Sequence, residues 1–291
     1  MISNADSRSA GRAFWGAAAP VSPYASLLDR MSGQPAASAN EIDSDARSPR
    51  ASRRHAALGT ARRGRATITN ETERHLANRK RAHLMSSITL IGTGNMARAI
   101  GTLALAGGNT VEVMGRDQSK ADDLAKALGG GATTGKWGAV PAGDIVITAL
   151  LYAGVVPVVA EYGDALAGKV IVDISNPFNA TFDGLAHSEE TSIAQEVAKV
   201  APATATVVKA FNTIFRNVLE KGRPNVFIAG DNARAKAGVA AFIESLGLRP
   251  LDVGGLKMAH WLEGMGLVTV ALAGNGVGHW DFALGVDEFT G

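Results

Sequence analysis

The sequence from Ile88 onward predicts a doubly wound α/β fold, in which a parallel sheet carries helices on both faces. Short runs rich in β-branched residues alternate with longer helical stretches, which is typical of parallel strands joined by crossover helices. The short runs are almost wholly apolar, as strands that are covered on both faces should be. A glycine-rich turn stands directly between the first run and the first helical stretch. We expect a small helical extension to follow at the C-terminus.

Periodicity and β-branched content place the individual elements. The predicted strands are residues 88–91, 110–114, 145–150, 169–174, 206–210, 226–229 and 249–253. The predicted helices are residues 95–106, 119–128, 155–166, 191–200 and 232–246. A last segment, from Leu256 to about Gly278, is apolar but interrupted by glycine, Glu263 and Asn275, so it is too short and too polar to span a bilayer. We expect it to form a helix buried against a partner subunit.

The composition divides the 291-residue chain into unlike parts. Residues 1–84 hold 14 of the 29 basic residues and 7 of the 27 acidic ones, so they carry a net charge of +7 and the remainder carries −5. Leu, Ile, Val and Phe make up only 10 of those 84 residues, too few to build a core. We expect 1–84 to be a disordered Arg-rich extension that precedes the biological start at Met85. A nucleotide-binding domain is expected at 85–254 and a C-terminal helical dimerisation segment at 255–291.

Charge and cysteine content exclude several functional classes. The acidic body of the chain favours neither nucleic acid nor an anionic membrane as a partner. The sequence contains no cysteine, which excludes disulfides, thiolate nucleophiles and Cys-ligated metals, and which fits the cytoplasm as the expected location. His260 and Glu263 lie one helical turn apart but lack a further ligand, so we predict no metal site and interpret them as a helix-surface pair.

The glycine-rich turn predicts a dinucleotide site. Residues 92–97 read G-x-G-x-x-A between a strand and a helix, the context in which this motif binds dinucleotides. Gly92 permits the tight turn, Gly94 lets the backbone approach a pyrophosphate, and Ala97 allows close packing of the helix on the strand. Amide groups and the dipole at the helix start would hold the phosphates. A turn that binds nothing is the structural alternative. The predicted pyrophosphate residues are Gly92, Thr93, Gly94, Asn95 and Met96.

The end of the second strand predicts which nicotinamide cofactor binds. An NAD site usually places an acidic side chain there for the ribose 2′-OH. This chain has Gly115-Arg116-Asp117 instead. Arg116 offers a planar fork to a 2′-phosphate, and Ser119 and Lys120 follow at the start of the next helix. We therefore predict NADP with Arg116, Ser119 and Lys120 at its 2′-phosphate, the alternative being a surface Arg116 paired with Asp117.

Residues at the ends of the later strands are the candidates for chemistry. Hydride transfer is mainly a positioning task, and ligands lie at these strand ends in open parallel sheets. Asn176 and Asn212 would hold the carboxamide or an acceptor carbonyl, although each also suits a turn or a helix cap. The other predicted cofactor contacts here are Leu150, Leu151, Pro177 and Phe211.

No clear acid–base constellation accompanies these residues. Tyr152 and Tyr162 lack a lysine four residues on, and His187 and His279 stand isolated in the sequence. Lys209 is a conceivable acid, although a lysine that ends a buried strand more often snorkels or pairs with a carboxylate. The catalytic residues therefore stay open, with Asn176, Lys209 and Asn212 as candidates. The pattern favours an acceptor that needs only hydride, at carbon or at a flavin-type nitrogen.

Six motifs in order along residues 87–291 resemble the NADPH-dependent coenzyme F420 reductase family. They are residues 91–96, 115–116 with Lys120, 172–177, 208–213, 229–231 and 251–256. The resemblance implies a Rossmann NADP-binding domain with a small helical C-terminal part, a homodimer, and hydride exchange between NADPH and F420. It implies that residues 93–96 bind the pyrophosphate and that Arg116 and Lys120 bind the 2′-phosphate. It further implies that the loops at 176–177 and 212–213 border the nicotinamide and the acceptor.

Departures from the family pattern leave the acceptor open. The archaeal members begin the turn with an extra glycine and have serine before the arginine, where this chain has Ile91 and Gly115. They also tend to have histidine within the segment matching 209–212. Residues 94–97 are similar to pyrroline-5-carboxylate reductases too, but the 38 residues after Val253 leave little room for their dimerisation domain.

The sequence therefore predicts an NADP-dependent oxidoreductase that acts on F420 or a related flavin-like small molecule. The alternatives are a pyrroline-5-carboxylate-reductase-like imine reductase, a ferric reductase and a non-catalytic NADPH-binding protein. The direction of the reaction is left open.

Overall fold

The computed structural model describes residues 85–188 and 190–289. Its strands are β1 Ser87–Ile91, β2 Thr110–Met114, β3 Thr133–Thr134, β4 Ile145–Thr148, β5 Val170–Asp173, β6 Thr206–Lys209, β7 Asn225–Gly230 and β8 Arg249–Asp252. Its helices are α3 Asn95–Ala106, α4 Gln118–Leu128, α5 Tyr152–Tyr162, α6 Ile193–Val200, α7 Arg216–Lys221, α8 Ala233–Ser245 and α9 Ala259–Gly274. Short 3₁₀ helices are η1 Gly163–Leu166, η2 Leu256–Met258 and η3 Gly278–Trp280. The predictions for residues 1–84 lie outside the described residues.

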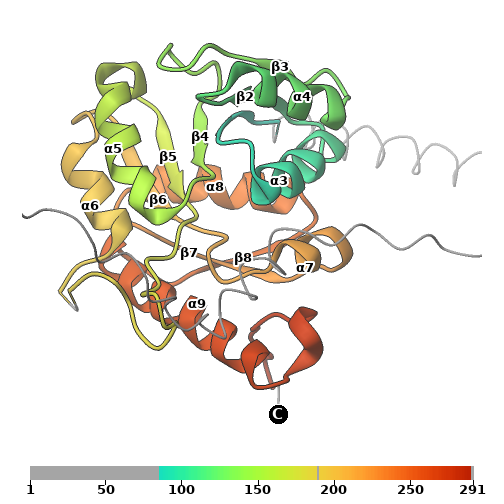
Figure 1. Cartoon of the computed structure of the whole chain (residues 1–291), viewed down its shortest axis with the longest axis vertical. Coiled ribbons are helices and arrows are strands. Elements are labelled where there is room, and N and C mark those ends of the chain that lie inside the picture. The colour runs from blue at the N-terminus through green and yellow to red at the C-terminus, as the bar shows by residue number, and fades with distance from the viewer. Residues whose placement is uncertain (1–84, 189, 290–291) are drawn as a thin grey trace, which may run out of the picture. The chain divides into compact units, whose positions relative to one another are not determined.

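These strands form one sheet in the order β3-β2-β1-β4-β5-β6-β7-β8, with helices on both of its faces (Figure 1). In the centre, Leu90 of β1 pairs in parallel with Val113 of β2 and with Ile147 of β4. The predicted doubly wound α/β fold is therefore confirmed. Because the strand order reverses between β1 and β4, the carboxyl ends of these strands form the switch point at which such sheets bind ligands.

Two strands, β7 and β8, depart from the predicted parallel arrangement and run opposite to the others. β7 pairs antiparallel with β6, through Val208 with Gly230 and Lys209 with Ala229. The helix between them, α7, packs against α3 and not along β6, so the chain enters β7 from the carboxyl end of β6. β8 then returns parallel to β7 by way of α8.

Two hydrophobic layers flank the sheet. Alternate side chains of a strand face opposite layers, so Leu90 belongs to one and Ile91 to the other. The first layer packs against α3, α4, α7 and α8, with Ile100 and Phe242 fully buried. The second packs against α5, α6 and the start of α9. This double cover explains why the strand sequences are almost wholly apolar.

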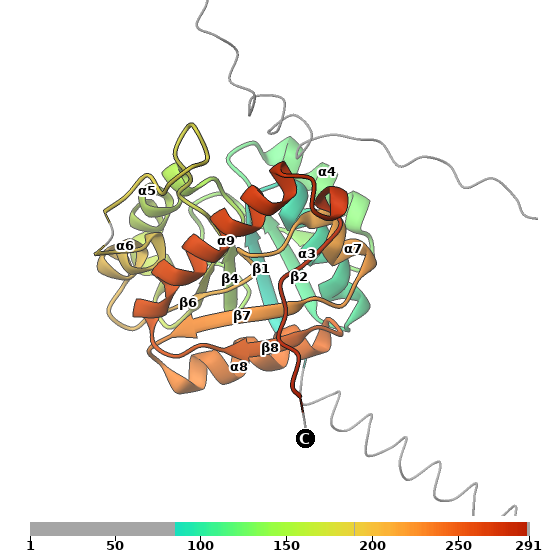
Figure 2. The same ribbon diagram turned by 90° about the horizontal axis from the view of Figure 1, so that it is seen from below.

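Helix α9 runs across the sheet over β7, as Figure 2 shows. Leu262 on its inner face packs against Phe227 and Ala229. Its outer face exposes Trp261 and Val268. A helix that is apolar on all sides is typical of one with partners on more than one side. No helix among the described residues is long and apolar enough to cross a bilayer.

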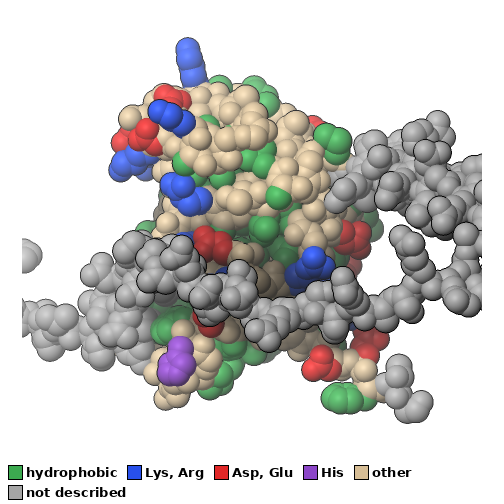
Figure 3. Space-filling model, turned by 90° about the vertical axis from the view of Figure 1, so that its right-hand side faces the viewer, with side chains coloured by type: hydrophobic (Ala, Val, Ile, Leu, Met, Phe, Trp, Pro, Cys, Tyr) green, Lys and Arg blue, Asp and Glu red, His purple; other side chains and the backbone are tan. Residues whose placement is uncertain are grey.

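Charged side chains are mixed on the face seen in Figure 3. There the described Lys and Arg side chains lie among Asp and Glu side chains and do not merge into a continuous basic patch. The charge of the described part is thus dispersed on that face.

Candidate functional site

The turn after β1 brings three strand ends together. Gly92 has φ +123°, which only glycine adopts without strain, and a Cβ there would lie 2.3 Å from the carbonyl oxygen of Ala149. Its amide donates to the carbonyl of Met114 at 2.8 Å. Gly92 is therefore required by the close approach of the ends of β1, β2 and β4.

The start of α3 is suited to an anion. Gly94 is its N-cap and contributes no capping side chain, and a Cβ at Gly94 would meet no atom within 4 Å. The first turn of α3, all of it described, carries no acidic side chain to offset the helix dipole. A phosphate can thus approach the backbone amides at the position where the sequence predicts the pyrophosphate.

Arg116 lies at the end of β2, held by two neighbours far away in the sequence. Its guanidinium lies 5.2 Å from the ring centroid of Trp137 and 3.6 Å from a carboxylate oxygen of Glu161. The indole N–H of Trp137 donates to the other Glu161 oxygen at 2.6 Å, and the edge of its ring packs on Tyr162. Burial raises the pKa of the Tyr162 hydroxyl above its ordinary value. The Arg116 side chain remains 66% exposed and open to a ligand.

Asp117 does not pair with Arg116, so that alternative is not observed. Asp117 caps α4 by accepting from the amide of Lys120, and its carboxylate lies 3.8 Å from the Lys120 ammonium. Ser119 and Lys120 are exposed in the first turn of the same helix. Local packing also explains why residue 115 is glycine, because a Cβ on Gly115 would lie 2.9 Å from Cγ2 of Thr93. Serine cannot occupy this position without a shift of Thr93.

The two predicted asparagines bind each other at the ends of β5 and β6. Asn176 donates to the backbone carbonyl of Asn212 at 2.7 Å, and the Asn212 amide donates to Oδ1 of Asn176 at 2.9 Å. The Asn212 amide also donates to the carbonyl of Leu262 in α9 at 2.8 Å. Both donor hydrogens of Asn212 are thus committed, and its side chain joins two loops and α9.

The other predicted residues of this edge divide into two groups. Leu150 is half-buried and Leu151 is 83% exposed, directly after β4, and Pro177 is buried beside Asn176. Phe211 instead lies in the core beside Phe242, with a left-handed φ of +59°. The structure therefore does not bring the Phe211 ring to the edge where Leu151 lies.

A cluster of buried charges lies directly beneath these loops. The Lys209 ammonium donates to Asp173 and to Glu263, each at 2.7 Å, and to the carbonyl of Ser175 at 2.6 Å. The side chains of Lys209, Asp173 and Glu263 are all fully buried. Lys209 thus pairs with carboxylates, one of the outcomes considered from the sequence.

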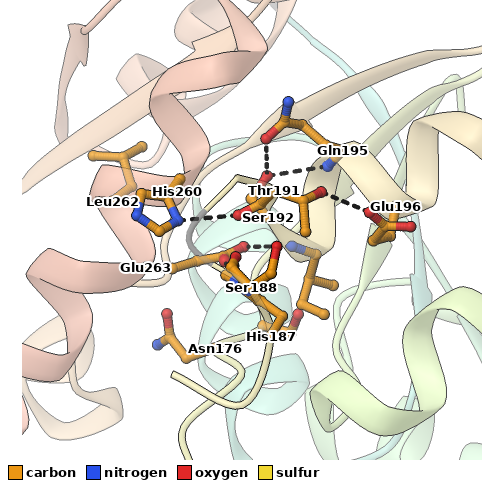
Figure 4. A network of polar contacts seen from close by, with 12 residues as sticks. Asn176, His187, Ser188, Thr191, Ser192, Gln195, Glu196, His260, Leu262 and Glu263 are labelled. Carbon is orange, nitrogen blue, oxygen red and sulfur yellow. Dashed lines mark hydrogen bonds and ion pairs between the residues drawn. The ribbon is translucent and has the colours of Figure 1, made fainter. Parts of the chain in front are cut away.

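His187 and Glu263 correct two interpretations made from the sequence. His187 is not isolated, because it lies beside Glu263 (Figure 4). Its Nε2 is 2.6 Å from a Glu263 oxygen, and its side chain is only 11% exposed. Glu263 does not form a helix-surface pair with His260, whose Nδ1 lies 3.0 Å from the carbonyl of Thr191. The other Glu263 oxygen accepts from the amide of Ile193 at the start of α6. Among the described residues, no group of His, Asp and Glu is arranged to hold a metal ion.

Sequence reasoning missed the roles of Asp173, Glu263 and His187. One signal was present, since Asp173 and Lys209 are charged residues that end two apolar strands, and the two strands pair at these residues. Two buried polar atoms of this region, Oγ of Ser175 and Oδ1 of Asn212, have no hydrogen-bond partner among the described residues. Orphaned atoms of this kind are typical of sites that take a ligand or ordered water.

Comparisons with known proteins find similarity in the described part of the chain. Residues 87–177 match the family model of the NADP oxidoreductase, coenzyme F420-dependent. The chain is 32% identical over 179 residues to the metalloreductase STEAP3 of Rattus norvegicus. The aligned region covers 59% of this chain and 34% of that protein. The chain thus spans about a third of the length of this curated relative.

Solved structures agree on the fold. A candidate F420-dependent NADP reductase from Arthrobacter sp. superposes with a TM-score of 0.58 at 25% identity, covering 65% of this chain and 93% of that one. A reductive aminase from Aspergillus terreus in complex with NADPH gives 0.51 at 22% identity, over 66% of this chain and 63% of that one, a likeness of fold alone. The resemblance noted in the sequence is confirmed for residues 87–177, which match the model of the F420-dependent NADP oxidoreductase family.

Proposed function

We propose that this protein is an NADP-dependent oxidoreductase that exchanges hydride between NADPH and coenzyme F420 or a related flavin-like acceptor. The observation that carries the proposal is the meeting of three strand ends at Gly92, with the open N-terminus of α3 on one side and Arg116 on the other. An anion-binding helix start and a cation at the end of β2 are the two features that NADP requires of this fold.

The residues at this edge fit the cofactor. Gly94 leaves the space that a pyrophosphate needs, and the exposed Arg116, Ser119 and Lys120 suit a 2′-phosphate. When bound, NADPH supplies the hydride. Leu150, Leu151, Asn176 and Pro177 would border its nicotinamide, where apolar side chains exclude water and the amide orients the ring. We assign Asn212 and Lys209 to support these loops from beneath, and Phe211 to the core.

The family description and the relatives support the choice of acceptor. The matching family is described as F420-dependent, and so is the Arthrobacter structure. A flavin or a ferric acceptor is the second candidate, because the curated relative with 32% identity is a metalloreductase. The reductive aminase shares the fold alone and gives no reason to prefer an imine substrate.

The test uses the full chain and follows two chromophores. NADPH and F420 are mixed with the protein without oxygen, and the absorbance of both is recorded. The proposal expects both absorbances to fall together and only in the presence of protein. If NADPH binds while F420 stays oxidised, the F420 assignment is wrong, and flavins and ferric chelates are tried in the same way. If NADPH binds and no acceptor is reduced, the protein is a non-catalytic NADPH-binding protein.

We further propose a homodimer, formed through the outer face of α9, and a cytoplasmic location. Trp261 and Val268, two apolar side chains exposed on the outer face of α9, support the dimer. The absence of cysteine from the sequence is compatible with a reducing compartment. The acceptor is a small molecule, and nucleic acid and membranes are not proposed as partners.

A further inference from the structure

The charge cluster of Lys209, Asp173, Glu263 and His187, called here the buried quartet, is costly to keep in a protein interior. Three of its side chains are fully buried, and removing such charges from water costs several kcal/mol per ion before pairing. When apolar residues of similar volume replace a buried ion pair, the folded protein is often equally stable or more stable. The quartet therefore calls for an explanation other than stability.

Hydrogen-bond partners fix the number of protons on the quartet. Nδ1 of His187 lies 2.8 Å from the carbonyl oxygen of Ser188, and its Nε2 lies 2.6 Å from a Glu263 oxygen. A neutral imidazole has only one N–H, so two such contacts require a second proton, either on the ring or on the Glu263 carboxyl. In both cases Lys209 with Asp173 and His187 with Glu263 carry no net charge together. Neutrality of the whole makes its burial tolerable.

The buried quartet fixes the backbone at the start of the loop after β5, residues 175–177. The amide of Ser175 donates to Asp173 at 3.0 Å, and its carbonyl accepts from Lys209 at 2.6 Å. Both backbone groups of Ser175 are thus fixed by charged, fully buried side chains. Charge-assisted bonds of this kind are shorter and stronger than neutral ones.

The next residue is fixed from the opposite side. Asn176 is joined to Asn212 by two hydrogen bonds, and α9 passes so close that a Cβ on Gly266 would lie 2.8 Å from Oδ1 of Asn176. Glu263, one helical turn before Gly266, anchors α9 on Lys209. The loop at 175–177 is therefore held by β5, β6 and α9 before any ligand arrives.

We propose that Lys209 is a positioning residue: through the neutral buried quartet it presets the Ser175–Pro177 loop in the shape that receives the nicotinamide half of NADPH. The inference rests on the proposed function, which places the nicotinamide at this loop. Lys209 itself does not touch the cofactor, because its three donors are directed to Asp173, Glu263 and Ser175. A merely structural quartet stabilises the fold without favouring one half of the cofactor.

The test compares NADPH with 2′,5′-ADP, which carries the adenosine and 2′-phosphate but no nicotinamide. The variant is Asp173→Asn with Lys209→Met, which leaves the His187–Glu263 pair balanced and keeps an acceptor for the Ser175 amide. It removes the bond from Lys209 to the Ser175 carbonyl. We expect NADPH binding to weaken by about tenfold or more, as the loss of a charged hydrogen bond implies, while 2′,5′-ADP binding changes by less than about twofold.

The matched control is Asp252→Asn with Lys236→Met. Lys236 likewise donates to a carboxylate, that of Asp252 at 2.9 Å, and to a backbone carbonyl, that of Gly254 at 3.1 Å, but it lies outside the buried quartet and the 175–177 loop. Both affinities should therefore stay within about twofold of those of the unaltered protein. An unchanged ratio of NADPH to 2′,5′-ADP affinity in the Lys209→Met double variant overturns the inference.

Two further results keep the outcomes distinct. If the unaltered protein binds neither ligand, the proposed cofactor is wrong, whatever the variants do. If the Lys209→Met double variant does not fold and therefore binds neither NADPH nor 2′,5′-ADP, hydrogen exchange of the unaltered protein tests whether the loop is preset. A preset loop protects the Ser175 amide before NADPH is added, whereas protection that appears only with NADPH contradicts the inference.

Discussion

At the scale of single residues, two neighbouring side chains orient the exposed Arg116 guanidinium. One of its faces lies on Trp137 and one side is turned to Glu161, which itself is fixed by the Trp137 indole. An exposed ion pair contributes little stability, about 0–1 kcal/mol. The arrangement therefore leaves Arg116 free to exchange Glu161 for a phosphate at small cost.

Replacement of Arg116 tests the choice of cofactor. Arg116→Ala should weaken NADPH binding by about tenfold or more, because a charge-assisted contact to phosphate is lost. NADH binding should change by less than about twofold, since NADH has no 2′-phosphate. Fluorescence titration of each cofactor measures both. Equal losses for the two cofactors would remove Arg116 from the 2′-phosphate site.

Trp137 is expected to affect NADPH binding indirectly, by orienting the Arg116 guanidinium. Trp137→Leu removes the ring beneath the guanidinium and should weaken NADPH binding by about two- to fivefold, as expected for an exposed cation–π contact. Trp261→Leu is the matched control, because Trp261 is 66% exposed on α9 and lies outside this contact. Isothermal titration with NADPH compares the two. A similar loss in both variants contradicts the role given to Trp137.

Gly92 sets the backbone of the phosphate turn. Gly92→Ala forces a Cβ into the Ala149 carbonyl and requires a φ that alanine rarely adopts. We expect the free energy of unfolding to fall by about 1–3 kcal/mol, the range for a strained backbone site. Gly94→Ala is the control for stability, because open space surrounds that position. Urea unfolding followed by circular dichroism measures both, and equal stability of the two variants would contradict the account.

At the scale of elements, what the sequence predicts depends on how local the evidence is. The bounds of α3 agree with the prediction because the glycine turn and the apolar periodicity both lie within the segment. The two-residue β3 and the six-residue α7 were missed, since neither is long enough to show a period. The antiparallel direction of β7 leaves no trace in an apolar run, because a strand buried on both faces reads alike in either direction.

The candidate site follows the same rule. The glycine turn at 92–97 and Arg116 are contiguous motifs, so the sequence alone can predict a site there. The buried quartet joins residues 36, 54 and 76 positions apart, so no spacing rule could reveal it. Only the fold brings Glu263 of α9 beneath the loops of β5 and β6.

The first turn of α6 makes stability depend on pH. Hydrogen bonds from Lys199 and Thr191 hold the pKa of Glu196 below its ordinary value. A depressed pKa stabilises the fold fully above the ordinary glutamate value of about 4.3 and less as pH falls through the folded-state pKa. Glu196→Gln should therefore cost less than about 1 kcal/mol near neutral pH and nothing in strong acid. Urea unfolding of both proteins across this range measures it, and a difference that persists in acid contradicts the assignment.

At the scale of the whole molecule, α9 links the candidate site to the proposed dimer. Its inner face carries Glu263 and Leu262 against the site, and its outer face exposes Trp261 and Val268. Trp261→Asp with Val268→Asp should convert the dimer into a monomer, because two charges cannot be buried unpaired at an apolar interface. Light scattering after gel filtration measures the mass. Val140→Asp, at another exposed position, should leave it unchanged, and a monomeric unaltered protein would end the dimer proposal.

Paired binding of NADPH and NADH to the full chain decides whether this protein has an NADP site. We expect saturable binding of NADPH at one site per chain. We expect NADH to bind more weakly by about tenfold or more, because NADH lacks the 2′-phosphate proposed to bind Arg116. Binding of neither cofactor, or equal binding of both, would contradict the NADP site that the fold, the turn at Gly92 and the family all support.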